Sequence, residues 1–211
     1  MKRLDYLFVQ STRLVFMGFF ICMAIFALDI RSDEQRIERI QNGQVDAMSL
    51  ADTMLGSGEA TSPRELIALA EQISQETGAK DARANGLLSR ALEIEPRLPS
   101  AHAQLTYLQT KQAGRPTESA IEHLEASFWD CPYCNQDLLR WRLAYVIMHW
   151  RDIPEEVRLQ AFAGADVLRW WYLDYEFLDQ IRKEAISKGI AFNAYQRKIY
   201  TPVRPSEIGQ N

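Results

Sequence analysis

Ala84–Pro96 (ANGLLSRALEIEP) and Ala120–Pro132 (AIEHLEASFWDCP) are the two segments that decide the fold. Each starts with a small residue, has a leucine four residues later and a second small residue after three more, and ends on a proline. These positions are Ala84, Leu88, Ala91 and Pro96 in the first segment and Ala120, Leu124, Ser127 and Pro132 in the second. Small residues let two helices approach closely, the leucine fills the space between them, and the proline ends the pair. The sequence therefore predicts helix pairs that repeat along the chain.

This spacing resembles the tetratricopeptide-repeat family over about residues 64–150. The two segments start 36 residues apart, slightly more than the period of about 34 residues in that family, and the turn Ala113–Pro116 can hold the difference. The first helices of the pairs lack the Trp, Gly and Tyr signature that is usual in that family, and Leu105 and Tyr107 are expected to fill comparable space. The resemblance implies an all-α solenoid used for binding, and an irregular antiparallel helical bundle is the alternative.

The composition suits one compact helical domain with a single core. The chain has 211 residues, of which 47% are hydrophobic and 25% are charged, and it has few β-branched runs, so we expect no sheet. A net charge of −4 gives no electrostatic reason to expect nucleic acid as a partner.

An uninterrupted apolar run, Leu14–Leu28 (LVFMGFFICMAIFAL), precedes the repeats. At 1.5 Å per residue it covers about 22 Å of a hydrocarbon layer that is roughly 30 Å thick. Lys2, Arg3 and Arg13 come before the run, and mixed charges follow it, which favours a cytoplasmic N-terminus. We therefore expect residues 1–31 to anchor the chain in the inner (cytoplasmic) membrane as a single pass, with its bulk on the periplasmic side. A cleaved signal peptide and a buried soluble helix are the alternatives.

The remaining chain divides into three parts. Residues 32–61 are expected to form a juxtamembrane helix and a linker, with Gly43 interrupting the helix and Gly56–Thr61 as the linker. Residues 62–200 form the repeat-like domain, which begins with a helix at Pro63 and later includes helices over 157–171, 175–187 and 190–200. Residues 201–211 are expected to be a flexible tail.

Cys131-Pro132-Tyr133-Cys134 is identical to the redox tetrapeptide of many glutaredoxins. That chemistry needs a thioredoxin-like sheet, which this sequence does not predict. We expect a loop disulfide between Cys131 and Cys134 in an oxidising compartment, with free thiols or thiol–disulfide exchange as alternatives. A zinc site completed by His123 or His149 lacks the usual second cysteine pair. No catalytic, cofactor-binding or metal-binding residue is assigned.

The five tryptophans all lie between Trp129 and Trp171. If they are buried they form the core of the last helices, and if they are exposed they form a platform for a partner protein or a sugar ring. Tyr107, Trp141 and Trp170 are the candidate partner-binding residues.

The segment RLAYV at 142–146, followed by HWRDIPEEVR at 149–158, resembles small membrane-anchored repeat proteins of bacterial surface-polysaccharide production. This resemblance implies an accessory role beside an envelope polymerase or ligase. We therefore expect a non-catalytic interaction protein without a cofactor, whose partner is an integral-membrane or periplasmic protein. Thiol–disulfide exchange through Cys131 and Cys134, or glycan binding, are the alternatives.

Overall fold

The computed structural model describes residues 31–32, 34–57, 62–77 and 82–198, and within these ranges every regular element is a helix. The prediction of an all-α fold is confirmed. The run Leu14–Leu28 and the predicted tail 201–211 lie outside the described residues. No helix in the described ranges combines the length and the apolar character that crossing a membrane requires.

The first described helices are joined by a turn at Gly43. A helix over 34–41 is followed by α2 (Ala47–Ser57), and Gly43 between them has a φ of 64°, a left-handed conformation that glycine adopts without steric cost. The predicted linker Gly56–Thr61 was placed too early, because Gly56 and Ser57 belong to α2. Burial of Ala47 and Ala51 holds α2 on its neighbours, which outweighs the low helix propensity of glycine.

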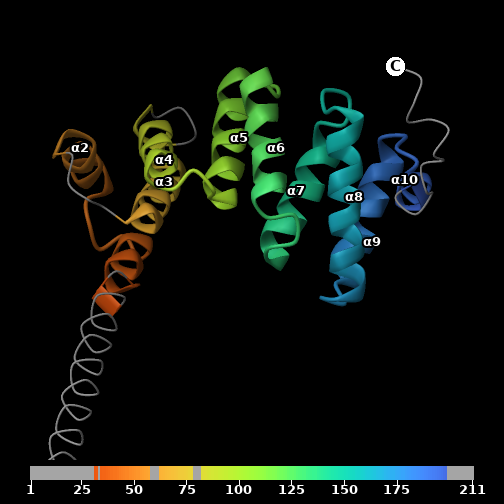
Figure 1. The fold of residues 1–211 in the computed structure, drawn as a ribbon, viewed down its shortest axis with the longest axis horizontal. Coiled ribbons are helices and arrows are strands. Elements are labelled where there is room, and N and C mark those ends of the chain that lie inside the picture. Colours follow the sequence, from red (N-terminus) through yellow and green to blue (C-terminus); the bar gives the residue numbers. More distant parts are fainter. Residues whose placement is uncertain (1–30, 33, 58–61, 78–81, 199–211) are drawn as a thin grey trace, which may run out of the picture.

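The next six helices form antiparallel pairs that stand side by side in a row (Figure 1). The pairs are α3 (Pro63–Thr77) with α4 (Ala82–Ile94), α5 (Pro99–Ala113) with α6 (Glu118–Asp130), and α7 (Gln136–Met148) with α8 (Glu155–Trp170). They are followed by α9 (Tyr175–Ser187) and α10 (Phe192–Lys198). The predicted start at Pro63 and the predicted helix over 175–187 are confirmed. The helix expected over 157–171 begins instead at Glu155, because Pro154 ends the preceding turn and leads directly into it.

The small and bulky positions of the two repeated segments are buried at equivalent places in α4 and α6. Ala84, Leu88 and Ala91 in α4, and Ala120, Leu124 and Ser127 in α6, are all fully inaccessible to solvent. The small residue at 120 lets α5 come close enough for the Thr106 hydroxyl to donate to the Ala120 carbonyl at 3.1 Å. The spacing therefore marks the contact between the two helices of a pair.

In the described part of the chain, the buried apolar side chains form two clusters, not the single core that the sequence suggested. The first runs from Ile40 through α2, α3 and α4 to Leu108 of α5. The second begins at Leu124 of α6 and ends at Phe192 of α10. In a row of helix pairs each pair contacts mainly its neighbours, so burial is spread along the row and is not gathered at one centre.

Arg142 joins three helices at the boundary between these clusters. Its side chain on α7 is 0% exposed, and its guanidinium donates to the Ser127 hydroxyl at 2.9 Å and to the Cys131 carbonyl at 2.9 Å. The Ser127 hydroxyl in turn donates to the Pro99 carbonyl at the start of α5, at 2.8 Å. Burial lowers the Arg142 pKa to about 10, and the charge of Asp130 acts in the opposite direction. The side chain therefore stays protonated at neutral pH and is held largely by uncharged oxygen atoms.

Replacing Arg142 with alanine is expected to lower the free energy of unfolding by about 3 kcal/mol or more, because the substitution leaves a cavity and strands buried carbonyl groups without donors. Arg142→Lys should recover only part of the loss, since one ammonium cannot reach all of these acceptors. Urea unfolding at neutral pH measures both changes. Arg182→Gln, in an exposed pair with Asp179, is the control and should change stability by less than about 0.5 kcal/mol. An equally small effect for Arg142→Ala would show that this network does not hold the helices together.

Candidate functional site

The loop between α6 and α7 is closed by a disulfide between Cys131 and Cys134, whose Cα atoms are 5.4 Å apart. Protein groups also hold its backbone: Arg142 donates to the Cys131 carbonyl, and the Tyr172 hydroxyl donates to the Cys134 carbonyl at 3.4 Å. The loop is therefore fixed from α7 and from the α8–α9 loop, in addition to its own disulfide. Between its cysteines, the side chain of Tyr133 is exposed.

The loop between α8 and α9 is fixed from α7. The Arg140 guanidinium donates to the buried Asp174 carboxylate at 2.8 Å, and Gln136 donates to the same carboxylate at 3.1 Å. The hydrogen bond from Arg140 is the main reason that the Asp174 pKa lies below its ordinary value. Next to this anchor, Leu173 has a φ of 54° with its side chain exposed. This left-handed conformation is strained for a bulky residue and persists because the surrounding contacts hold it.

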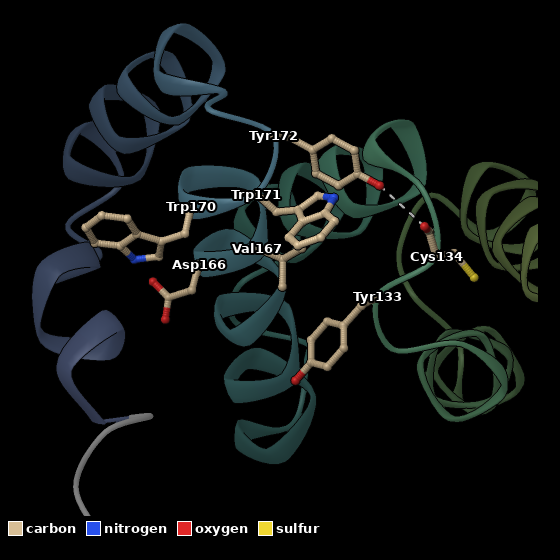
Figure 2. Close-up of a pocket in the computed structure, with 7 residues that line it drawn as sticks. All are labelled: Tyr133, Cys134, Asp166, Val167, Trp170, Trp171 and Tyr172. Atoms are coloured by element: carbon tan, nitrogen blue, oxygen red, sulfur yellow. Dashed lines mark hydrogen bonds between the residues drawn. The ribbon is translucent and has the colours of Figure 1, made fainter.

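The two loops together present an exposed apolar surface, which we call the aromatic edge. It consists of Trp129, Tyr133, Trp170, Trp171, Leu173 and Tyr175, all of which are exposed. Figure 2 shows Trp171 and Tyr133 beside Val167 of α8, with Trp170 on the other side of the α8 end, next to Asp166. A hollow of about 600 Å³ is lined by three members of the edge, Tyr133, Trp170 and Trp171, together with Val167, Tyr172 and neighbouring residues. The edge is thus a shallow apolar surface that extends over two loops and the end of α8.

A second hollow, of about 640 Å³, lies across the first helices of the three pairs, and we call it the α3–α5–α7 groove. Its floor is formed by the buried side chains Ala70, Ala103, Leu108 and Leu138. Its walls carry polar and aromatic side chains from all three helices: Glu71, Ser74 and Gln75 from α3, Gln104, Tyr107 and Lys111 from α5, and Asp137 and Trp141 from α7. An apolar floor with polar groups at its rim is typical of a binding site.

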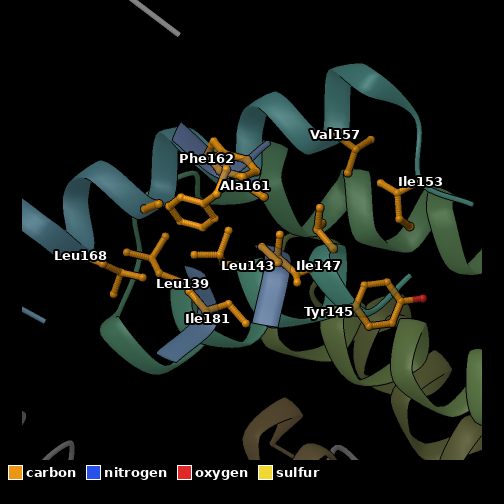
Figure 3. Close-up of a cluster of buried hydrophobic side chains, with 14 of the residues drawn as sticks. Leu139, Leu143, Tyr145, Ile147, Ile153, Val157, Ala161, Phe162, Leu168 and Ile181 are labelled. Atoms are coloured by element: carbon orange, nitrogen blue, oxygen red, sulfur yellow. The ribbon is translucent and has the colours of Figure 1, made fainter. Parts of the chain in front are cut away.

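The wall of the groove at α7 is built on a row of three rings in contact. Trp141 stacks on Tyr145 with ring centroids 5.1 Å apart, and Tyr145 lies 4.7 Å from His149 by the same measure. Tyr145 is at the margin of the second apolar cluster with its hydroxyl pointing away from Leu143 (Figure 3). That hydroxyl is 2.6 Å from the Thr110 hydroxyl of α5. The bond holds α7 at a fixed distance from α5 beneath the groove.

The three candidate partner-binding residues fall at two separate places. Tyr107, 40% exposed, and the half-buried Trp141 both line the α3–α5–α7 groove, whereas Trp170, 67% exposed, belongs to the aromatic edge. Sequence reasoning missed the polar groove residues, although Gln104, Tyr107 and Lys111 are spaced three and four residues apart and so share one face of a helix. Lys111 donates to the Tyr107 hydroxyl at 2.9 Å, which fixes that ring at the groove wall.

A histidine pair lies between α5 and α6. The Nδ1 atoms of His102 and His123 are 3.0 Å apart, and the His102 Nε2 atom is 3.2 Å from the Pro96 carbonyl. Because a carbonyl only accepts, His102 Nε2 carries a proton, and in the neutral pair His123 donates to His102. The Asp130 carboxylate is 3.5 Å from His102 Nε2. Burial, with a smaller effect of His102, lowers the pKa of His123.

Neither histidine belongs to a metal site in the described part of the chain, where no three His, Cys, Asp or Glu side chains lie close enough together to hold an ion. The zinc alternative also required free thiols at Cys131 and Cys134, which the disulfide occupies. Comparison with protein-family models, with curated proteins and with solved structures finds no match to this chain.

The lowered pKa of His123 predicts a loss of stability in mild acid. The unfolded chain binds a proton at this residue near its ordinary pKa of about 6.5, whereas the folded chain does so only at lower pH. The stability that the neutral His123 side chain contributes to the fold is therefore complete above a pH of about 6.5 and declines as the pH falls below this value. Urea unfolding between pH 8 and pH 5 should show that the free energy of unfolding declines less for His123→Gln than for the unsubstituted protein.

The decline should not disappear in His123→Gln, because burial also lowers the pKa of His149. Glu122→Gln, on the exposed side of α6, is the matched control and should keep the full decline above pH 5. Parallel pH profiles for the His123→Gln variant and the original chain would show that this residue does not contribute.

Proposed function

We propose that this chain is a non-catalytic interaction protein that binds a segment of a partner protein in the α3–α5–α7 groove. The observation that carries the proposal is the groove itself. It is a hollow of about 640 Å³ with an apolar floor and with polar and aromatic walls from three successive helix pairs. An apolar side chain of the partner fits the floor at Leu108 and Leu138. The rim offers amide, hydroxyl and charged groups to the backbone and flanking residues of the partner.

The charges at the rim favour a partner segment of mixed character. Glu71 and Asp137 lie on opposite walls, from α3 and α7, and Lys111 lies between them on α5. Two carboxylates and one ammonium favour a segment with basic residues on either side of an apolar anchor. The helix pairs are of the tetratricopeptide-like kind in this proposal, which is supported by the buried small and bulky positions of α4 and α6.

The proposal includes a membrane tether at Leu14–Leu28, with the groove on the periplasmic side of the inner membrane. A tether raises the effective concentration of the groove beside an integral-membrane or periplasmic partner. The sequence resemblance over 142–158 supports a partner in envelope polysaccharide synthesis or export. The alternative of thiol–disulfide exchange uses Cys131 and Cys134, whose disulfide lies outside the groove.

Changing the groove wall should strongly reduce partner capture without unfolding the chain. Tyr107→Ser and Glu71→Lys alter exposed positions, and together they should weaken binding about tenfold or more, since aromatic anchors carry a large share of binding energy. The test is a photoreactive side chain at Gln104 in the full-length protein in cells, followed by purification in mild detergent and quantification of the crosslinked partner.

Two controls separate the groove from other surfaces. Ile186→Ser, at an exposed apolar position of α9, should leave the crosslinked product unchanged. Cys131→Ser with Cys134→Ser should also leave it unchanged, because bonds from Arg142 and Tyr172 hold that loop as well. If the groove variants capture the partner as well as the original chain, binding lies elsewhere. If capture depends on the cysteines through mixed disulfides, the thiol–disulfide alternative replaces the proposal.

A further inference from the structure

The aromatic edge exposes more indole surface than the fold requires. Trp171 is 80% and Trp129 is 76% exposed, and neither supports the apolar core that lies behind them. Large contiguous apolar surfaces on a folded protein mark sites of interaction. The edge is also confined to one side of the row, where α6 passes into α7 and α8 passes into α9 (Figure 1).

The backbone holds this surface outward. Leu173 keeps a left-handed φ of 54° with its side chain exposed, and the bonds of Asp174 to Arg140 and of Tyr172 to the Cys134 carbonyl fix the residues on either side of it. An exposed leucine contributes little to the stability of the fold, so this strained conformation presents an apolar group to something outside the chain.

The chemistry of the edge fits the boundary between water and lipid better than it fits a sugar. A sugar ring needs several free hydrogen-bonding groups, but in the hollow of Figure 2 the Tyr172 hydroxyl donates to the Cys134 carbonyl, and Asp166 accepts a hydrogen bond from Gln196 at 3.3 Å. What remains exposed is mainly indole and phenol rings with one polar atom each. Trp and Tyr with this character concentrate at the level of lipid headgroups.

The position of the edge agrees with the proposed tether. The described chain begins at the lower left of Figure 1, on the side of the row that carries the α6–α7 and α8–α9 loops. The 15-residue run Leu14–Leu28 ends shortly before this point. A tether in that run would leave the aromatic edge on the side of the domain that faces the membrane.

We infer that the aromatic edge rests in the headgroup region of the bilayer and holds the row of helix pairs against the membrane surface. The partner is the lipid surface, and the contact is chiefly apolar, because the edge has no cluster of basic residues among its members. Arg169, whose guanidinium is 5.1 Å from the Trp170 ring, is a cation beside it, and Arg140 nearby is paired with Asp174. The inference rests on the membrane tether of the proposed function, but it does not depend on what the groove binds.

The test uses the full-length chain reconstituted into phosphatidylcholine vesicles that contain lipids brominated near the carbonyl end or near the methyl end of the acyl chain. Bromine quenches tryptophan emission at short range. We expect strong quenching, about twofold greater with the bromine near the carbonyl end, because interfacial rings lie at headgroup depth. In a variant with Trp129→Ser, Trp170→Ser and Trp171→Ser, emission comes only from Trp141 and Trp150, and most of the quenching should be lost.

The control variant carries Met148→Ser and Ile186→Ser, which are exposed apolar positions away from the edge, and it should be quenched like the original chain. Leu173→Ser, which keeps all five tryptophans, should reduce the quenching. Circular dichroism checks that the variants are folded, and the single change Trp171→Ser replaces the triple variant if that one is not.

Flotation of the vesicles separates the two proposals. If the chain floats with the vesicles but its edge tryptophans are not quenched, or if the quenched fraction is unchanged in the serine variant, the edge does not touch lipid and the inference is overturned. If the chain does not float, both the tether and the lipid contact are overturned. If oligosaccharide or a co-purified protein shields the edge tryptophans while brominated lipid does not quench them, the edge binds that other class of partner. Crosslinking from the groove is scored separately in each case.

Discussion

The buried guanidinium of Arg142 is the constraint on which the C-terminal half of the structure depends. One side chain on α7 reaches the end of α6 and, through the Ser127 hydroxyl, the start of α5. It also fixes the loop that carries the disulfide. Taking a charge out of water is costly unless hydrogen bonds replace the water. The three helices therefore have to meet at the position where these acceptors converge, and the groove and the aromatic edge both take their geometry from that junction.

The row of helix pairs gives the molecule two surfaces of different chemistry. The first helices of the pairs contribute the groove, with polar side chains around an apolar floor. The loops between the later pairs contribute the aromatic edge, with exposed rings and few free polar groups. Because the surfaces are formed by different parts of each pair, they can change independently in sequence. The proposed partner and the proposed lipid surface therefore use separate parts of the molecule.

The helix pairs were predictable from the sequence because they depend on local signals. Small residues at Ala84 and Ala120, and prolines at Pro63 and Pro154, mark contacts and helix starts that need no knowledge of distant parts of the chain. The division of the tryptophans was not predictable in this way. Trp141 lines the groove and Trp171 stands in solvent, and the difference depends on how α7 and α8 pack. Arg142 likewise looked like one more charged helical residue, because its acceptors are carbonyls that no sequence pattern marks.

The boundary between the two apolar clusters runs through the α5–α6 pair, where directional bonds join the helices. Thr106 donates to the Ala120 carbonyl, Ser127 donates to the Pro99 carbonyl, and His102 meets His123. Apolar contacts alone allow neighbouring helices to slide, whereas several hydrogen bonds permit only one register. The α3–α5–α7 groove crosses this boundary, and the bond between Thr110 of α5 and Tyr145 of α7 sets its width on that side before any ligand arrives. A ligand that matches this width binds without the entropy loss of ordering its site, and one that does not match has to break buried hydrogen bonds to enter.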